Sequence, residues 1–385
     1  MNEFRKQEKR VATFIYPGQT IGIIGAGMRA YWLALTARAM GFHIAVLAAR
    51  PTDPALQVAD YQFIGSLASA QDLAKLGEVS NCTILMDENA DDELLQKYAQ
   101  HHYFPQKAAI LSITQDRYLE KVFLNDHNIN IAPYTTVLNV QDVYDAVDSI
   151  GYPCIIKPIQ KGLGKERQHV IYCADDIPGS APYLQHGSYI MESWIPCEKE
   201  LAVVVAKDQD GSLTTYPVIE SHYQDQELAA SVIKARIAPE VGDEVRRIAR
   251  QIGNAIDYCG VFSVEFFLTS ADTIYVKSVI PGPLDAGDVF SETMDFSQYE
   301  MHLRSLCCWP LPKPHLLKEG IMARIQQQQI SASFTQIQIK PDWHFHYYPL
   351  DGPISDETAI GHVTIVGQDL RKLANQVNAT DLWNV

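Results

Sequence analysis

The chain opens on short apolar runs separated by glycines, a pattern that predicts a parallel α/β unit. Residues 20–27 (TIGIIGAG) form an apolar strand that runs into glycines, and residues 28–41 then follow a helical pattern. Further apolar runs at 43–49 and 81–89 predict two more strands. A strand, a glycine turn, a helix and a second strand in this order are typical of a doubly wound parallel sheet.

The pattern changes after about residue 112. Residues 141–158 predict a helix, a stop at Gly151 and a strand, and residues 243–258 carry apolar positions at helical spacing. The tail consists of short alternating runs that are typical of a small β-rich domain. We therefore expect three domains, with the ranges 1–112 (α/β), 113–310 (mixed α and β) and 311–385 (β-rich).

A hairpin in the middle domain carries the clearest chemical signal. Residues 261–267 (VFSVEFF) and 275–281 (YVKSVIP) predict two strands of one sheet. Glu265 lies in the apolar strand, and a buried carboxylate needs a metal or a cation nearby. The facing strand offers Lys277 and Ser278 rather than a second carboxylate. The alternative is that Glu265 lies on a solvent-facing side of the sheet.

The N-terminal glycines are a fragment of a dinucleotide fingerprint. Gly25 and Gly27 are present, but Ala30 stands where a third glycine is expected, and the sequence AAR (48–50) stands where an acidic residue is expected. NAD therefore has little support. Two alternatives stay open, namely a tight turn and a phosphate-bearing ligand at the N-terminus of the following helix.

Two further segments have the composition of a nucleotide site. Residues 157–168 (KPIQKGLGKERQ) place Lys157 at a strand end before a basic, glycine-containing loop that could cover phosphates. Residues 191–201 (MESWIPCEKEL) place Glu192 and Glu200 on either side of an apolar bend. Each segment taken alone is equally consistent with an exposed hairpin.

Composition narrows the function classes. The 385 residues carry a net charge of −15, which argues against binding to nucleic acid or to an anionic membrane surface. We find no secretory signal and no apolar run long enough to span a bilayer. The seven cysteines form no CxxC pair, as in a reduced, cytoplasmic protein.

Taken in order, these segments resemble the ATP-grasp superfamily, and within it the 5-(carboxyamino)imidazole ribonucleotide synthetases. The likeness runs over almost the whole chain and rests on these segments: PGQTIGIIGAG (17–27), PALQVAD (54–60), QDRYLEK (115–121), GYPCIIK (151–157), GVFSVEFF (260–267), SQYEMHLRS (297–305) and GHVTIVG (361–367). The resemblance implies a biotin-carboxylase-like N-terminal domain, a two-lobed ATP-grasp domain and a C-terminal β-rich domain. It also implies ATP and Mg²⁺ as cofactors, a homodimer, and the bicarbonate-dependent carboxylation of aminoimidazole ribonucleotide.

The resemblance also implies roles for individual residues. Phosphate contacts would come from Arg117, Lys157 and Lys165, the adenine site from Glu192 to Ile195, and the ribose contact from Glu200. Glu265 would be the first magnesium ligand, and Gly25 and Gly27 would belong to the substrate site. Lys277 stands where the family has Asn, and we expect its ammonium to take the place of a metal's charge by pairing with Glu265 or with a phosphate.

Other positions depart from the family pattern. The family strand NEIAPRPHNSGH reads KSVIPGPLDAGD at 277–288, so Ser278 replaces the second metal ligand and Gly282 replaces a catalytic arginine. Basic groups expected near the substrate phosphate are replaced by Leu350 and by Thr358 and Ala359. Three hypotheses follow: an active synthetase, an ATP-grasp ligase for another small-molecule acceptor, or a non-catalytic protein that binds nucleotide or a partner protein.

Overall fold

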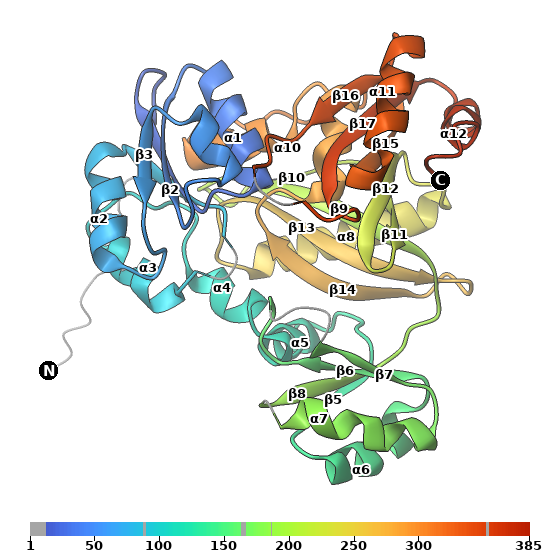
Figure 1. Cartoon of the computed structure of the whole chain (residues 1–385). Helices are drawn as coiled ribbons and strands as arrows, with labels where there is room; N and C mark the ends of the chain where they lie inside the picture. The colour runs from blue at the N-terminus through green and yellow to red at the C-terminus, as the bar shows by residue number, and fades with distance from the viewer. Residues whose placement is uncertain (1–12, 88–89, 163–166, 186, 352–353) are drawn as a thin grey trace, which may run out of the picture.

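The computed structural model describes residues 13–385 apart from 88–89, 163–166, 186 and 352–353. The chain forms an N-terminal α/β unit, a small four-stranded lobe and a nine-stranded sheet that continues into the C-terminal segment (Figure 1). None of the helices in these residues combines the length and the apolar character that crossing a bilayer requires.

The N-terminal unit is a parallel sheet with the strand order β3-β2-β1-β4. Its strands are β1 (Thr20–Ile24), β2 (His43–Ala48), β3 (Tyr61–Ile64) and β4 (Cys82–Leu85), and its helices are α1 (Met28–Ala39), α2 (Ala70–Val79) and α3 (Asp92–Tyr98). Every residue of β1 is buried, as expected for a strand covered on both faces. The predicted doubly wound sheet is confirmed.

A turn at Gly25 directs the chain from β1 into α1. Gly25 has a φ of 93°, and a Cβ placed there would lie 2.8 Å from the Cβ of Asp87. Only glycine satisfies both conditions without strain. The turn places Met28 and Arg29 at the start of α1, beside the site described below.

The small lobe is an antiparallel sheet with the order β5-β8-β6-β7. Its elements are α5 (Arg117–Asp126), β5 (Tyr134–Val137), α6 (Val140–Ile150), β6 (Cys154–Pro158), β7 (His169–Ile171), α7 (Ala181–Leu184) and β8 (Tyr189–Ser193). α6 begins at a capping box formed by Asn139 and Asp142, and Gly151 follows its last residue with a φ of 80°. The helix, stop and strand predicted at 141–158 are therefore present. Helix α4 (Ala109–Thr114) connects the N-terminal unit to this lobe.

The nine-stranded sheet has the order β14-β13-β9-β11-β12-β15-β17-β16, and β10 pairs with β9. Its strands from the middle of the chain are β9 (Cys197–Lys207), β10 (Leu213–Thr215), β11 (Ile219–Gln224), β12 (Glu227–Ile233), β13 (Gly260–Thr269) and β14 (Ile274–Pro281). The helices α8 (Pro239–Ala255), α9 (Phe290–Thr293) and α10 (Gln298–Leu306) accompany them. The first seven residues of β13 are all buried, and β13 forms the expected hairpin with β14.

The C-terminal segment extends this sheet rather than forming a sheet of its own. It contains β15 (Glu319–Gln326), α11 (Ile330–Ile339), β16 (His344–Tyr347), β17 (Ala359–Gly367) and α12 (Leu370–Asn378). β15 pairs with β12, so the backbone hydrogen bonds run on from the middle of the chain into the tail. The two helices were not apparent from the alternating pattern of the tail, and the domain boundaries stay a prediction.

Candidate functional site

A cavity of about 280 Å³ lies between the small lobe and the nine-stranded sheet. The lobe side contributes α5, β6 and β8, and the other side is formed by the hairpin of β13 and β14. Its volume is close to the lower end of the range for small-molecule sites, roughly 300–1,000 Å³. The cavity brings together Arg117, Lys157, Glu192, Glu265, Lys277 and Ser278, which the sequence had suggested as site residues.

The lobe side carries three cations around one carboxylate. The Nζ atoms of Lys157 and Lys121 lie 3.3 and 3.6 Å from the Glu192 carboxylate oxygens. Asp116 caps α5 and so fixes Arg117 at its first position, where the Nε atom donates to the Pro158 carbonyl. The group has a net positive charge and faces the cavity, as a phosphate site requires.

Burial and charge shift the pKa values of this cluster. Burial lowers the pKa of Lys157 and that of Arg117, against the attraction of Glu192. For Glu192, burial acts to raise the pKa, but the neighbouring Lys157, Lys121 and Arg117 outweigh it and lower the pKa. The carboxylate therefore stays ionised and holds the cations in place in the absence of nucleotide.

A second carboxylate, that of Glu120, connects the two sides of the cleft. Glu120 is buried on α5, and one of its carboxylate oxygens accepts from the Val279 backbone N–H on β14. Its other oxygen lies 2.8 Å from the Nζ atom of Lys161. The sequence alone did not predict Glu120, Lys121 and Lys161 as site residues. The i, i+4 spacing of Arg117 and Lys121 on one helix was the available signal.

Glu265 is buried, with 7% of its surface exposed, so the solvent-facing alternative is wrong. The hydroxyls of Tyr223 and Ser278 donate to its two carboxylate oxygens, each at 2.7 Å. Burial, followed by the nearby Glu265 charge, raises the pKa of Tyr223, so this hydroxyl keeps its proton. Glu265 thus has a protein donor on each oxygen.

Lys277 lies between two carboxylates. Its ammonium group is 2.8 Å from Glu200 Oε2 and 3.7 Å from Glu265 Oε2, and it sits 4.4 Å from the centre of the Tyr223 ring. Burial acts to lower the pKa of Lys277, but the charges of Glu265 and Glu200 outweigh burial and raise it. The ammonium is therefore a fixed positive charge at this end of the cleft.

A β-bulge explains why adjacent residues reach the same carboxylate. Glu265 pairs with Ser278 and Phe266 pairs with Val276, which leaves Lys277 without an opposite residue on β13. Alternation along a regular strand would place the side chains of Lys277 and Ser278 on opposite faces. The extra residue of a bulge changes this direction.

The groups around Glu265 do not fit a divalent cation. Mg²⁺ prefers several oxygen ligands in octahedral geometry, whereas Glu265 has an ammonium group and two hydroxyl donors as its neighbours. In the part of the chain that the structure describes, no group of three or more His, Cys, Asp or Glu side chains is placed to hold a metal ion.

The remaining sequence-based site residues lie at different places. Ile195 is in the bend between β8 and β9, and its carbonyl accepts from the Cys197 backbone N–H. Lys165 lies outside the described residues. Gly25 and Gly27 form the turn into α1, where Gly27 is the residue before the helix. Their part in substrate binding stays a prediction.

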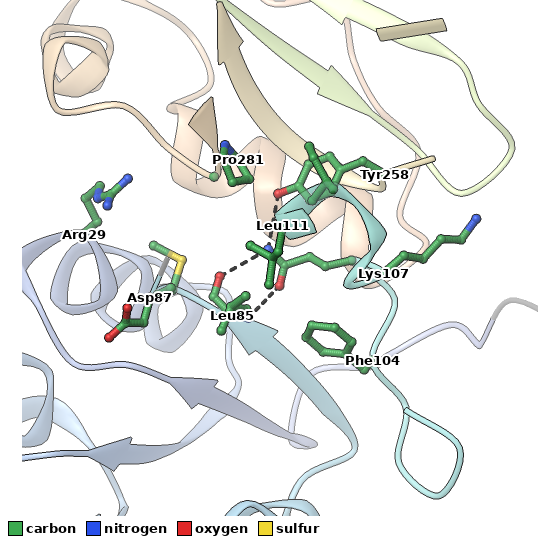
Figure 2. A pocket seen from close by; sticks show the side chains of 12 residues that line it. Arg29, Leu85, Asp87, Phe104, Lys107, Leu111, Tyr258 and Pro281 are labelled. Atoms are coloured by element: carbon green, nitrogen blue, oxygen red, sulfur yellow. Dashed lines mark hydrogen bonds between the residues drawn. The ribbon is translucent and has the colours of Figure 1, made fainter. Parts of the chain in front are cut away.

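Gly282 is the residue after β14 and lines a separate, very small cavity. Figure 2 shows this cavity. This cavity measures about 20 Å³, which is room for about one water molecule. Gln106 lines this cavity, and its side chain makes hydrogen bonds with the Leu85 backbone and the Tyr258 hydroxyl. Gly282 has a φ of 91°, so an arginine at this position would be strained even though open space surrounds its Cβ direction.

A second large cavity, of about 450 Å³, adjoins the first at Glu265, which lines both. Helix α1 and the strands β11 to β14 contribute to its lining, and so does the segment that follows β14. Strand β15 and the residues around β17 complete it. Arg324 on β15 is central to one wall: it is 3.5 Å from Asp285, 3.7 Å from Asp288, and donates to the Tyr348 hydroxyl. The sequence alone did not predict these charged residues as site residues.

Asp288 is the most perturbed carboxyl in this cavity. Burial raises its pKa to about 7, and Asp285 adds to the rise, while Arg324 and a hydrogen bond from Tyr299 act in the opposite direction. The folded protein therefore keeps a proton on Asp288 at pH values where the unfolded chain has released it.

We expect Asp288 to contribute a fall in the free energy of unfolding as pH rises from about 4 to about 7, because its carboxyl group binds a proton in the folded state but not in the unfolded state over this range. Replacing Asp288 with Asn should flatten this slope, as measured by urea unfolding across the range. Asp243→Asn, at an exposed position on α8, is the matched control and should keep the wild-type slope. Equal slopes in Asp288→Asn and wild type would show that Asp288 does not titrate as described.

The family comparisons agree with this geometry. Residues 122–299 match the ATP-grasp domain family, and residues 18–115 match the family of ribonucleotide synthetase preATP-grasp domains. The cleft between a small lobe and a larger sheet is lined by four lysines and one arginine. Together with these matches, it defines an ATP-grasp protein.

The similarity extends over nearly the whole chain. The sequence is 30% identical over 357 residues to the N5-carboxyaminoimidazole ribonucleotide synthase of Staphylococcus saprophyticus, covering 92% of this chain and 95% of that one. It is 29% identical over 354 residues to the enzyme of the same name from Bacillus subtilis, covering 92% and 93%. An ADP complex of an N5-carboxyaminoimidazole ribonucleotide synthetase superposes with a TM-score of 0.92 at 29% identity, over 96% of this chain and 98% of that one. The chain belongs to the N5-carboxyaminoimidazole ribonucleotide synthase family, and the resemblance found in the sequence is confirmed.

Proposed function

We propose that this protein binds ATP in the 280 Å³ cleft and that the carboxylation for which its relatives are named is much slowed or lost. The observation that carries the proposal is the position of Lys277, whose ammonium is 2.8 Å from Glu200 and 3.7 Å from Glu265. An ammonium at this place repels a divalent cation and engages the carboxylate expected to bind the ribose.

ATP binding is supported by the lobe side of the cleft. Arg117, Lys121 and Lys157 surround one carboxylate, so an excess of positive charge is available for phosphates. A solved relative with a TM-score of 0.92 is an ADP complex. The bend at Ile195 lies next to Glu192 and is the candidate adenine site.

Slow carboxylation follows from the hairpin of β13 and β14. Phosphoryl transfer relies on metal ions that bridge phosphate oxygens and neutralise developing charge. Glu265 offers a single carboxylate, Ser278 faces it in the strand register, and Gly282 brings no side chain. We therefore propose that Mg²⁺ enters with the nucleotide rather than on a site built by the protein.

The second candidate is the full family reaction, ATP- and bicarbonate-dependent carboxylation of aminoimidazole ribonucleotide. The likeness over 92% of the chain to enzymes with this name favours it. A homodimer and a cytoplasmic location remain predictions under either candidate.

The first experiment separates the two candidates. ADP release is measured with Mg²⁺, ATP and bicarbonate, with and without aminoimidazole ribonucleotide. We expect little release and no stimulation by the ribonucleotide. Clear stimulation would establish the family reaction and would contradict the role assigned to Lys277.

ATP binding is tested separately by calorimetry. Replacing Lys157 with Met should weaken ATP binding by roughly tenfold to a hundredfold, because a charge-assisted hydrogen bond contributes about 1.5–3 kcal/mol. Lys75→Met is the matched control, since Lys75 pairs with Asp72 on the surface of α2. Equal affinities in both variants would place the nucleotide elsewhere.

A further inference from the structure

The 450 Å³ cavity has an acidic lining. Its wall includes two arginines, Arg29 and Arg324, and four carboxylate residues, Glu227, Glu265, Asp285 and Asp288. None of the described residues that line it is a lysine. Even with Asp288 protonated, the other three carboxylates outnumber the two cations on this surface, in contrast to the lobe side of the ATP cleft.

Both arginines already have partners in the wall. Arg324 is only 9% exposed and lies between Asp285, Asp288 and the Tyr348 hydroxyl. The Nη1 atom of Arg29 donates to the Pro283 carbonyl at 3.2 Å, and its Nε atom is 3.9 Å from Asp285. A phosphate entering the cavity would compete with these groups for each guanidinium.

Asp285 is placed to act on a ligand. Its side chain is 55% exposed and lies between Arg29 and Arg324, so it contacts both cations while it remains open to solvent. A carboxylate here repels a phosphate dianion and accepts hydrogen bonds from an amine. The same lining contains the rings of Trp32, Tyr223 and Tyr348, which supply aromatic surface for an aromatic ligand to pack against.

We propose that this cavity binds an aromatic amine that carries no phosphate, such as an amino nucleoside rather than a nucleotide. The inference rests on the proposed function, because it takes this cavity as the second ligand site of an ATP-binding protein. The cavity shares Glu265 with the ATP cleft. It goes further by naming the chemical class of that ligand.

The test uses a pair of probes that differ only in the phosphate. Calorimetry compares 5-aminoimidazole riboside with 5-aminoimidazole ribonucleotide on the full chain. We expect the riboside to bind at least as tightly as the ribonucleotide. A preference for the ribonucleotide of about tenfold or more, the effect of one charge-assisted bond, would overturn the proposal, and so would failure of both probes to bind.

A variant without the Asp285 charge tests whether this carboxylate causes the preference for a ligand without phosphate. Asp285→Asn removes the one carboxylate that both guanidiniums share, so ribonucleotide affinity should rise by about tenfold while riboside affinity does not rise. Asp243→Asn, which removes an exposed carboxylate paired with Arg246 on α8, is the matched control and should change neither affinity. Equal behaviour of the two variants would contradict the role of Asp285.

Failure of this inference can be told apart from failure of the proposed function. ATP binding is read through Lys157→Met at the other cavity. If ATP binds as proposed and the ribonucleotide is strongly preferred, only the ligand class is wrong. If the riboside is preferred and ATP does not bind, only the nucleotide assignment is wrong.

Discussion

Replacing Lys277 with Asn and Ser278 with Glu in one chain is expected to raise Mg²⁺-dependent ATP hydrolysis by about tenfold or more. Ser278 lies opposite Glu265 in the antiparallel register, where facing Cβ atoms are roughly 4.5–5.5 Å apart. A glutamate at 278 would therefore place two carboxylates within reach of one ion. Removing the ammonium at 277 takes away the charge that competes with that ion. ADP release at increasing Mg²⁺ concentration is the measurement.

The single variants show which change is needed. Ser278→Glu alone keeps the ammonium, which would pair with the new carboxylate, so little gain is expected. Lys277→Asn alone leaves one carboxylate and should also gain little. Lys75→Asn on the surface of α2 is the control. If the double variant hydrolyses ATP no faster than wild type, the change at 277 and 278 did not by itself silence the site, and the φ of 91° at Gly282 becomes the next feature to test.

Replacing Glu192 with Gln is expected to lower the free energy of unfolding by about 3 kcal/mol, the cost of leaving buried charges without their partner. The Glu192 and Lys121 side chains are 12% and 7% exposed, so water screens this cluster poorly. Without the carboxylate, Lys121, Lys157 and Arg117 repel one another across the wall of the cleft. Urea unfolding without nucleotide measures the loss.

The matched control is Glu244→Gln. Glu244 pairs with Arg247 at 2.7 Å on the exposed side of α8, and such surface pairs contribute about 0–1 kcal/mol. A loss of stability in Glu192→Gln no larger than in this control would mean that the cations find other partners and that Glu192 does not organise the cleft.

Local sequence determined the elements and much of the site. Apolar run lengths and glycines predicted β1, the turn at Gly25 and the hairpin of β13 and β14, because each of these depends on residues close together in the chain. The motif order predicted the ATP-grasp family, which the comparisons confirm. The apolar strand around Glu265 was enough to predict that this carboxylate needs a nearby cation.

The tertiary structure alone decided which partners those residues have. Lys277 reaches Glu200 on β9 and Glu265 on β13 because three neighbouring strands and one bulge bring them to the same face. Asp285 and Arg324 meet because β15 pairs with β12 and so joins the nine-stranded sheet. Contacts between distant segments depend on strand order and register, which no short stretch of sequence records. The sequence by itself therefore determined the fold, the family and the presence of a charged cleft, while packing decided whether each charge is available to a ligand or already neutralised.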